Sequence, residues 1–309
     1  MSKVLVSKYL PLILLGGLLL TGLLTIFLQA DNYGITMDEP VQNTYGHMAL
    51  KWYLTLGKDT SFLTAFGSNG PIMSAHGVIF DVGVAEVQNL FPAQDPWHVR
   101  RIVTALVGLL GLVAIALCGY ELGGYWLAFL AALALWLYPR YYGAIYNNPK
   151  DIPAAVVTTF VLWGALLLIK QWGQKKRYLR NSLLVGFLIG FASAIRVTAV
   201  VWYVILALIL IAWWLLQGKR VRRENGMHAE LIKQAIAAST IGITSLLTMM
   251  IFWPYIFLNP LVNLYQSIKI MSQYPWDGDV LYNGIVYHAT QLPRTYVPEW
   301  LVIASPPAL

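Results

Sequence analysis

Long apolar runs separated by short polar segments make up most of the chain. A helix that crosses a bilayer needs about 20 apolar residues, with a range of about 17–25. Outer-membrane barrels show short alternating segments instead. The sequence therefore predicts an all-α polytopic membrane protein with a single transmembrane domain over residues 1–309. Its predicted spans are 9–28, 102–118, 124–138, 153–169, 181–195, 197–216 and 235–253, with a partial span at 298–309.

The first run has an alternative interpretation as a signal peptide. Lys3 and Lys8 would form its basic region, and Leu28-Gln29-Ala30 would be a poor cleavage site. Its apolar stretch, 10–28, is longer than the 7–15 residues typical of such a peptide. We therefore expect a retained membrane anchor.

Composition supports the membrane assignment. Of the 309 residues, 58% are hydrophobic and 11% are charged, and the mean hydropathy is +0.61. A soluble domain carries roughly 25% charged residues. These values exclude an ordinary cytosolic enzyme and a disordered chain. The single cysteine, Cys118, cannot form a disulfide within the chain.

The net charge of +7 is explained by membrane topology. With the N-terminus in the cytoplasm, the cytoplasmic segments hold 12 basic and three acidic residues, and the opposite side holds 9 basic and 11 acidic residues. This asymmetry follows the positive-inside rule. We therefore expect a multi-pass protein of the cell inner membrane, with the lipid bilayer as a partner and no nucleic-acid partner.

Two long connections face the outer side in this topology, at 29–101 and 254–297. Long connections are usually functional, so the active loops are expected to face the periplasm or exterior. The stretch 72–91 mixes apolar residues with Asp81 and Glu86 at roughly helical spacing. It predicts one or two amphipathic helices at the membrane interface.

The first outer loop contains an acid pair, Asp38-Glu39, followed by Pro40. A carboxylate just outside the bilayer can act as general base on a hydroxyl, provided that its pocket partly excludes water. Alternatively, the pair belongs to a solvated turn at a helix start.

Three charged residues are candidates for binding a phosphate. Lys150 and Asp151 join the third and fourth spans, and Arg196 interrupts an apolar stretch. A cation at the membrane face suits a phosphate or lipid headgroup. The alternatives are a helix cap for Asp151, placed before Pro153, and a snorkelling boundary residue for Arg196.

The remaining candidates are single residues. His76 and His288 lie in the outer loops and are possible substrate ligands, and Arg294 is a boundary cation. No histidine cluster predicts a metal site, and Asp277 and Asp279 form only a short Asp-x-Asp match for a divalent cation. No glycine-rich nucleotide signature is present. The sequence therefore predicts no cofactor.

Taken together, these motifs resemble a known family. An Asp-Glu pair opens the first loop, and Asn148-Pro149-Lys150-Asp151-Ile152-Pro153 precedes the fourth span. Later, Leu292-Pro293-Arg294-Thr295-Tyr296-Val297-Pro298-Glu299-Trp300 runs into Ala304-Ser305-Pro306-Pro307. The chain resembles the bacterial family 39 glycosyltransferases, relatives of the protein O-mannosyltransferases and the aminoarabinose transferase. The resemblance implies a GT-C-like transmembrane helical bundle.

The resemblance also implies an activity, namely inverting transfer of a sugar from a polyprenyl-phosphate donor to an acceptor hydroxyl on a protein, lipid or glycan. Asp38 would be the catalytic base and Glu39 would orient it. Lys150 would contact the donor phosphate, with Arg196 or Arg294 behind it. Asp151 would hold Lys150 or the acceptor.

Two alternatives remain open from the sequence. A transporter or flippase would share the many spans, although such proteins usually show internal repeats. Family members usually have eleven or more spans, whereas here the eighth has only begun. The second alternative is therefore an inactive fragment of a glycosyltransferase.

Overall fold

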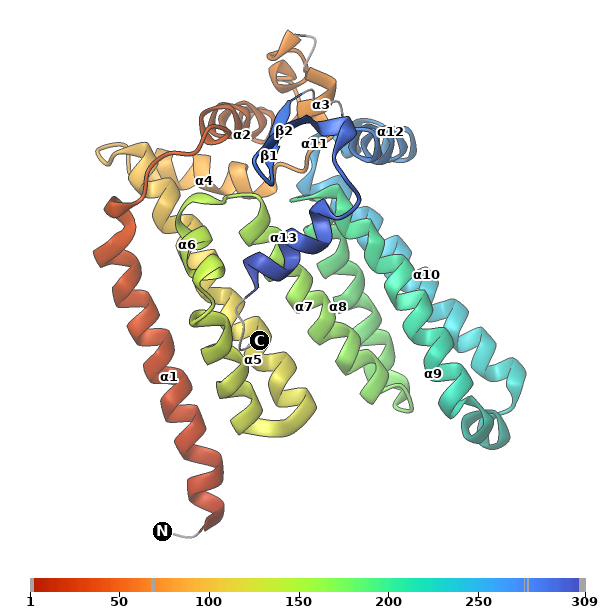
Figure 1. Ribbon diagram of the computed structural model, residues 1–309. Helices are drawn as coiled ribbons and strands as arrows, with labels where there is room; N and C mark the ends of the chain where they lie inside the picture. The colour runs from red at the N-terminus through yellow and green to blue at the C-terminus, as the bar shows by residue number, and fades with distance from the viewer. Residues whose placement is uncertain (1–2, 68–69, 275, 277, 306–309) are drawn as a thin grey trace.

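The computed structural model describes residues 3–67, 70–274, 276 and 278–305, and the chain is predominantly α-helical (Figure 1). Four of its helices are long and apolar enough to cross a membrane. These are α1 (Lys3–Gln29), α5 (Pro96–Trp136), α7 (Asp151–Lys170) and α10 (Met227–Phe252). Helices α8 (Lys175–Ser193) and α9 (Val201–Asn225) complete the bundle.

Helix α5 is a hairpin of two helical arms. Its backbone leaves the helical region at Gly123 and Gly124, and Gly124 has a φ of 78° that L side chains rarely adopt. A Cβ on Gly119 would lie 2.7 Å from the carbonyl oxygen of Leu127, so the arms pack with their backbones nearly touching. The two arms correspond to the predicted spans 102–118 and 124–138, and the second arm ends at Trp136.

Glycines also allow α8 to pack closely on α10. A Cβ on Gly186 would lie 2.7 Å from the carbonyl oxygen of Ile241, and one on Gly190 would lie 2.4 Å from that of Ser245. The chain then leaves α8 and passes through Arg196 into a short 3-10 turn, η4 (Val197–Val200), before α9. This break separates the predicted spans 181–195 and 197–216.

The two long connections lie together at the end of the bundle opposite the N-terminus (Figure 1). The first contains η1 (Ala30–Asn32), α2 (Glu39–Leu54), η2 (Ser61–Leu63), α3 (Gly70–Ser74) and α4 (Ile79–Leu90). The second contains α11 (Pro254–Leu258), α12 (Pro260–Ser272), β1 (Asp279–Tyr282), β2 (Ile285–His288) and η5 (Ala289–Gln291). Helix α13 (Tyr296–Ala304) follows, and residues 306–309 of the predicted partial span lie outside the described residues.

One buried cluster joins both connections to the bundle. It includes Tyr45 and Phe62 from the first connection, Ala194 from the end of α8 and Trp253 from the end of α10. The indole of Trp253 donates a hydrogen bond to the carbonyl oxygen of Ser74 at 3.2 Å. Loop segments distant in sequence therefore have a common core, and this core determines how they face one another.

The strands β1 and β2 are a difference from the all-α expectation. They pair antiparallel across Asn283 and Gly284, which have φ values of 50° and 78°. An Asn-Gly pair with positive φ is typical of a two-residue hairpin turn. This short signal is in the sequence, but the hairpin was not predicted.

Candidate functional site

A cavity of about 850 Å³ lies where the two long connections meet the ends of the helices. Four separate parts of the chain form its wall: the segment before α2, the turn after α3, the connection from α6 (Pro139–Asn147) to α7, and the break after α8. The end of α12 closes the remaining side. Its polar and charged lining residues include Thr36, Asp38, Gln42, His76, Asn147, Asn148, Lys150, Asp151, Arg196 and Thr198.

The acid pair at the start of α2 divides between two environments. Asp38 lines the cavity and is exposed, and its carboxylate has no hydrogen bond or ion pair with any described residue. Glu39 is only 2% exposed. Its carboxylate accepts hydrogen bonds from the backbone N–H of Thr36 at 2.6 Å and from the Thr36 hydroxyl at 3.1 Å. The helix start therefore presents Asp38 to the cavity and directs Glu39 into the protein.

A buried arginine behind the cavity holds this arrangement. Arg100, in the first arm of α5, is fully buried, and its Nε lies 3.7 Å from Glu39 Oε1. Its Nη2 lies 2.7 Å from Asp81 Oδ1 and 3.2 Å from Gln42 Oε1. A buried charge is stable only when it is paired and hydrogen-bonded, so these groups form one network.

Arg100 is not among the residues that the sequence pattern marks as candidates, and the pattern predicts Asp81 on an interfacial helix. A helix is present in this stretch as α4, and the structure buries Asp81 on it, against α2, whereas Glu86 is exposed. Gly46 makes this possible, because a Cβ there would lie 2.5 Å from the carbonyl oxygen of Asp81. Asp81 within the mostly apolar stretch 72–91 is the feature of the sequence that could have indicated a buried cation nearby.

The connection between α6 and α7 is held against the segment before α2. The rings of Tyr33 and Tyr146 stack with their centroids 4.2 Å apart. The hydroxyl of Thr36 donates to the carbonyl oxygen of Asn147 at 3.4 Å. These contacts bring Lys150 and Asp38 to the same cavity although the two residues are far apart in sequence.

Helix α7 starts at Asp151, but Asn148 provides its side-chain cap. The backbone N–H of Asp151 donates to Asn148 Oδ1 at 3.0 Å, and Asn148 Nδ2 donates to Asp151 Oδ2 at 3.1 Å. The remaining carboxylate oxygen of Asp151 forms an ion pair with Arg196. Asp151 therefore links two parts of the cavity wall, in addition to its place at the helix start.

Lys150 is half-buried in the wall of the cavity. Burial lowers the pKa of its ammonium group, and the positive charge of Arg196 acts in the same direction. The carboxylates of Asp81 and Asp38 oppose this shift by favouring the charged form. The ammonium group is therefore a poorly solvated cation within the field of Asp38.

A close backbone contact places His76 beside Arg196. A Cβ on Gly77 would lie 2.2 Å from the carbonyl oxygen of Ala194, and the N–H of Ile79 donates to that same oxygen at 3.2 Å. Burial, together with the charges of Lys150 and Arg196, lowers the pKa of His76 to about 3. The imidazole is therefore neutral at physiological pH.

The structure brings together Asp38, Lys150, Asp151, Arg196 and His76 from the predicted site, with Glu39 directly behind. The other two candidates are not part of the cavity. Arg294 is exposed in the turn before α13. His288 ends β2, where its Nδ1 lies 2.8 Å from the Thr290 hydroxyl.

The structure also adds residues that the sequence analysis had not selected. Tyr274 and Trp276, after α12, line the cavity, as does Gln42 of α2. In the part of the chain that the structure describes, no three His, Cys, Asp or Glu side chains are grouped to hold a metal ion. Asp279 is exposed at the start of β1, and Asp277 lies outside the described residues.

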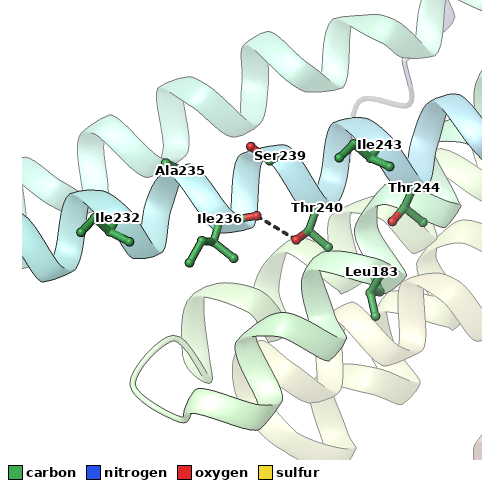
Figure 2. Close-up of a pocket in the computed structure, with 8 residues that line it drawn as sticks. All are labelled: Leu183, Ile232, Ala235, Ile236, Ser239, Thr240, Ile243 and Thr244. Atoms are coloured by element: carbon green, nitrogen blue, oxygen red, sulfur yellow. Dashed lines mark hydrogen bonds between the residues drawn. The ribbon is translucent and has the colours of Figure 1, made fainter.

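A second hollow, of about 510 Å³, lies between α8 and α10 (Figure 2). Its lining is mostly aliphatic, with Ser239, Thr240 and Thr244 as the polar members. The hydroxyl of Thr240 donates to the carbonyl oxygen of Ile236 in its own helix at 2.8 Å. This hollow has no charged lining residue and is not a candidate for the chemistry.

Comparison of the chain with protein-family models, curated proteins and solved structures gave no match.

Proposed function

We propose that the protein is an integral membrane glycosyltransferase. It transfers a sugar from a polyprenyl-phosphate donor to an acceptor hydroxyl at the outer face of the inner membrane, with inversion. One observation carries the proposal: the cavity combines Asp38, a carboxylate without a partner among the described residues, with two cations, Lys150 and Arg196. A base for the incoming hydroxyl and cations for a leaving phosphate are the groups that this reaction requires.

In the proposed reaction, Asp38 accepts the proton of the acceptor hydroxyl. The acceptor oxygen forms a bond to the anomeric carbon, and the bond from that carbon to the phosphate oxygen breaks. Polyprenyl phosphate leaves with the electron pair. Lys150 and Arg196 stabilise the negative charge that develops on the phosphate. Because Asp38 is exposed, the bound donor itself must exclude water from its carboxylate.

The position of the cavity supports an outer-face reaction. The two long connections that contribute to its lining lie at the end of the bundle opposite the N-terminus, whereas the α7–α8 and α9–α10 turns lie at the N-terminal end (Figure 1). Those turns belong to the basic segments that the positive-inside rule assigns to the cytoplasm. A lipid-linked donor is suited to this location, because its polyprenyl chain remains in the bilayer while its phosphate reaches the cavity.

The test separates binding from chemistry. The 309-residue protein is purified in detergent, and its thermal shift is measured with a polyprenyl phosphate and with the same polyprenol lacking phosphate. Transfer of labelled glucose from polyprenyl phosphate glucose to bacterial envelope fractions is measured in parallel. Asp38→Asn should abolish transfer and retain donor binding, Lys150→Ala should weaken donor binding, and Glu86→Gln, an exposed acid on α4, should change neither.

Two results would contradict the proposal. Wild-type transfer by Asp38→Asn would show that Asp38 is not the base. Equal binding of the phosphorylated and unphosphorylated polyprenols would remove the donor site and favour a transporter or an inactive fragment.

A further inference from the structure

Three rings line part of the cavity, and we call them the aromatic wall: His76, Tyr274 and Trp276. The rings of His76 and Tyr274 meet edge to face, with their centroids 6.1 Å apart. Tyr274 and Trp276 retain 50% and 53% of their surface exposed. The second long connection thus contributes uncovered aromatic surface to a cavity whose charges come from other parts of the chain.

His76 is the residue that joins the aromatic wall to the charged side. It lies within the field of Lys150 and Arg196 and also contacts Tyr274. Because its pKa is about 3, the imidazole is uncharged at pH 7 and offers one N–H donor and one nitrogen acceptor. Neither ring nitrogen of His76 has a hydrogen-bond partner among the described residues. Because the ring is uncharged, it would not attract phosphate as a cation would.

We propose that the aromatic wall is the binding site for the sugar ring of the donor, and that it selects an uncharged pyranose. The inference rests on the proposed function and adds the substrate class. The C–H face of a pyranose is flat and apolar, so it packs against exposed aromatic rings. Its hydroxyls both donate and accept hydrogen bonds, which matches a neutral imidazole.

Charge explains the preference for an uncharged sugar. The aromatic wall itself contains no carboxylate that could pair with an ammonium group. The positive charges of Lys150 and Arg196 act on His76, and these cations would repel an amino sugar. They would instead attract the donor phosphate.

The experiment measures the binding increment due to the sugar. Calorimetric titrations of the full chain in detergent compare three probes: a polyprenyl phosphate, the same lipid bearing glucose, and the same lipid bearing 4-amino-4-deoxyarabinose. We expect the glucosyl lipid to bind more tightly than the bare phosphate. Trp276→Ala should lower the affinity for the glucosyl lipid by about fivefold to tenfold, the size typical of one aromatic contact. It should leave the affinity for the polyprenyl phosphate without sugar unchanged.

Two further variants control for loss of folding. Trp276→Phe keeps a ring and should keep most of the increment. Tyr265→Ala removes a 62% exposed ring on α12 that does not line the cavity, so it should bind all three probes as wild type does. Thermal unfolding of each variant shows whether the fold is retained.

The outcomes separate this inference from the proposed function. The sugar site alone is overturned if the protein binds polyprenyl phosphate but binds the glucosyl lipid no more tightly. It is also overturned if Trp276→Ala lowers the affinity for both of these lipids equally. Tighter binding of the aminoarabinose lipid than of the glucosyl lipid overturns the selection of an uncharged sugar. Failure of the wild type to bind any of the phosphates overturns the proposed function, and the sugar site with it.

Discussion

Nη2 of Arg100 lies 2.7 Å from Oδ1 of Asp81, and the two side chains are 0% and 3% exposed. The same guanidinium group lies 3.7 Å from Glu39, the residue after the proposed base. Gln42, which accepts a hydrogen bond from Arg100 at 3.2 Å, lines the cavity. A single arginine therefore connects the first arm of α5, the buried face of α4 and the start of α2.

Removal of this arginine should destabilise the protein strongly. Arg100→Ala would leave Glu39 and Asp81 buried without their cation, and breaking a buried pair costs about 3–5 kcal/mol. Thermal unfolding of the purified variant should show a markedly lower midpoint. Arg140→Ala, which removes an exposed arginine, should unfold as wild type does. Unfolding of Arg100→Ala at the wild-type midpoint would show that the network contributes little to stability.

Two glycines of the first long connection should respond differently to the same change. Gly77→Ala places a Cβ 2.2 Å from the backbone oxygen of Ala194, and overpacking of this kind costs about 1–3 kcal/mol. The displaced turn should also move His76 and weaken polyprenyl phosphate binding. A Cβ on Gly83, in α4, would have no atom within 4 Å. Gly83→Ala should therefore stabilise the protein, because alanine favours a helix. Equal midpoints of thermal unfolding for the two variants would contradict the close contact between Gly77 and Ala194.

The ion pair between Asp151 and Arg196 should affect binding more than stability. The side chains are 57% and 40% exposed, and such pairs contribute about 0–1 kcal/mol. Asp151→Asn should therefore unfold close to the wild type. It should bind polyprenyl phosphate more tightly, because Arg196 loses its competing carboxylate, whereas Arg196→Ala should bind it more weakly. Calorimetric titration with polyprenyl phosphate measures both affinities. Weaker binding by both variants would contradict the competition between Asp151 and the phosphate, and would show that the intact ion pair is needed for binding.

His76 should make the protein less stable at mildly acidic pH. Its pKa is lowered from 6.5 to about 3 in the folded state, so the unfolded chain binds a proton between these values and the folded chain does not. Stability therefore falls as pH decreases below about 6.5, by about 2 kcal/mol between pH 7 and 5 for this residue. Chemical denaturation at pH 7 and pH 5 measures the loss in the free energy of unfolding. That loss should be smaller by about 2 kcal/mol in His76→Gln than in the wild type. An identical loss in wild type and variant would contradict the shift.

The helical character of the chain could be predicted because it depends on local pattern. A helix satisfies its backbone hydrogen bonds within one segment, so an apolar run of suitable length is sufficient evidence. The break at Arg196 could be predicted for the same reason, because a charge interrupts the run. Helix α2 and the strands β1 and β2 are short and mixed in composition, and they were not predicted.

The candidate site could be predicted only in part. Asp38 and Lys150 precede helices in motifs that are visible along the chain. Arg294 and His288 have similar chemistry and similar loop positions, yet they lie outside the cavity. The difference comes from contacts between distant segments, such as the Tyr33–Tyr146 stack and the approach of Gly77 to Ala194, which no local pattern encodes.

The sequence by itself determined the predominantly helical, apolar character of the protein and the presence of an acid pair in the first long connection. Only the tertiary structure decided that Glu39 faces Arg100 while its neighbour Asp38 faces the cavity, and that Trp276 comes from the other long connection to the same cavity. The reason is physical. Burial of apolar length is a property of each segment, whereas the pairing of a buried charge and the shape of a cavity depend on which segments pack together.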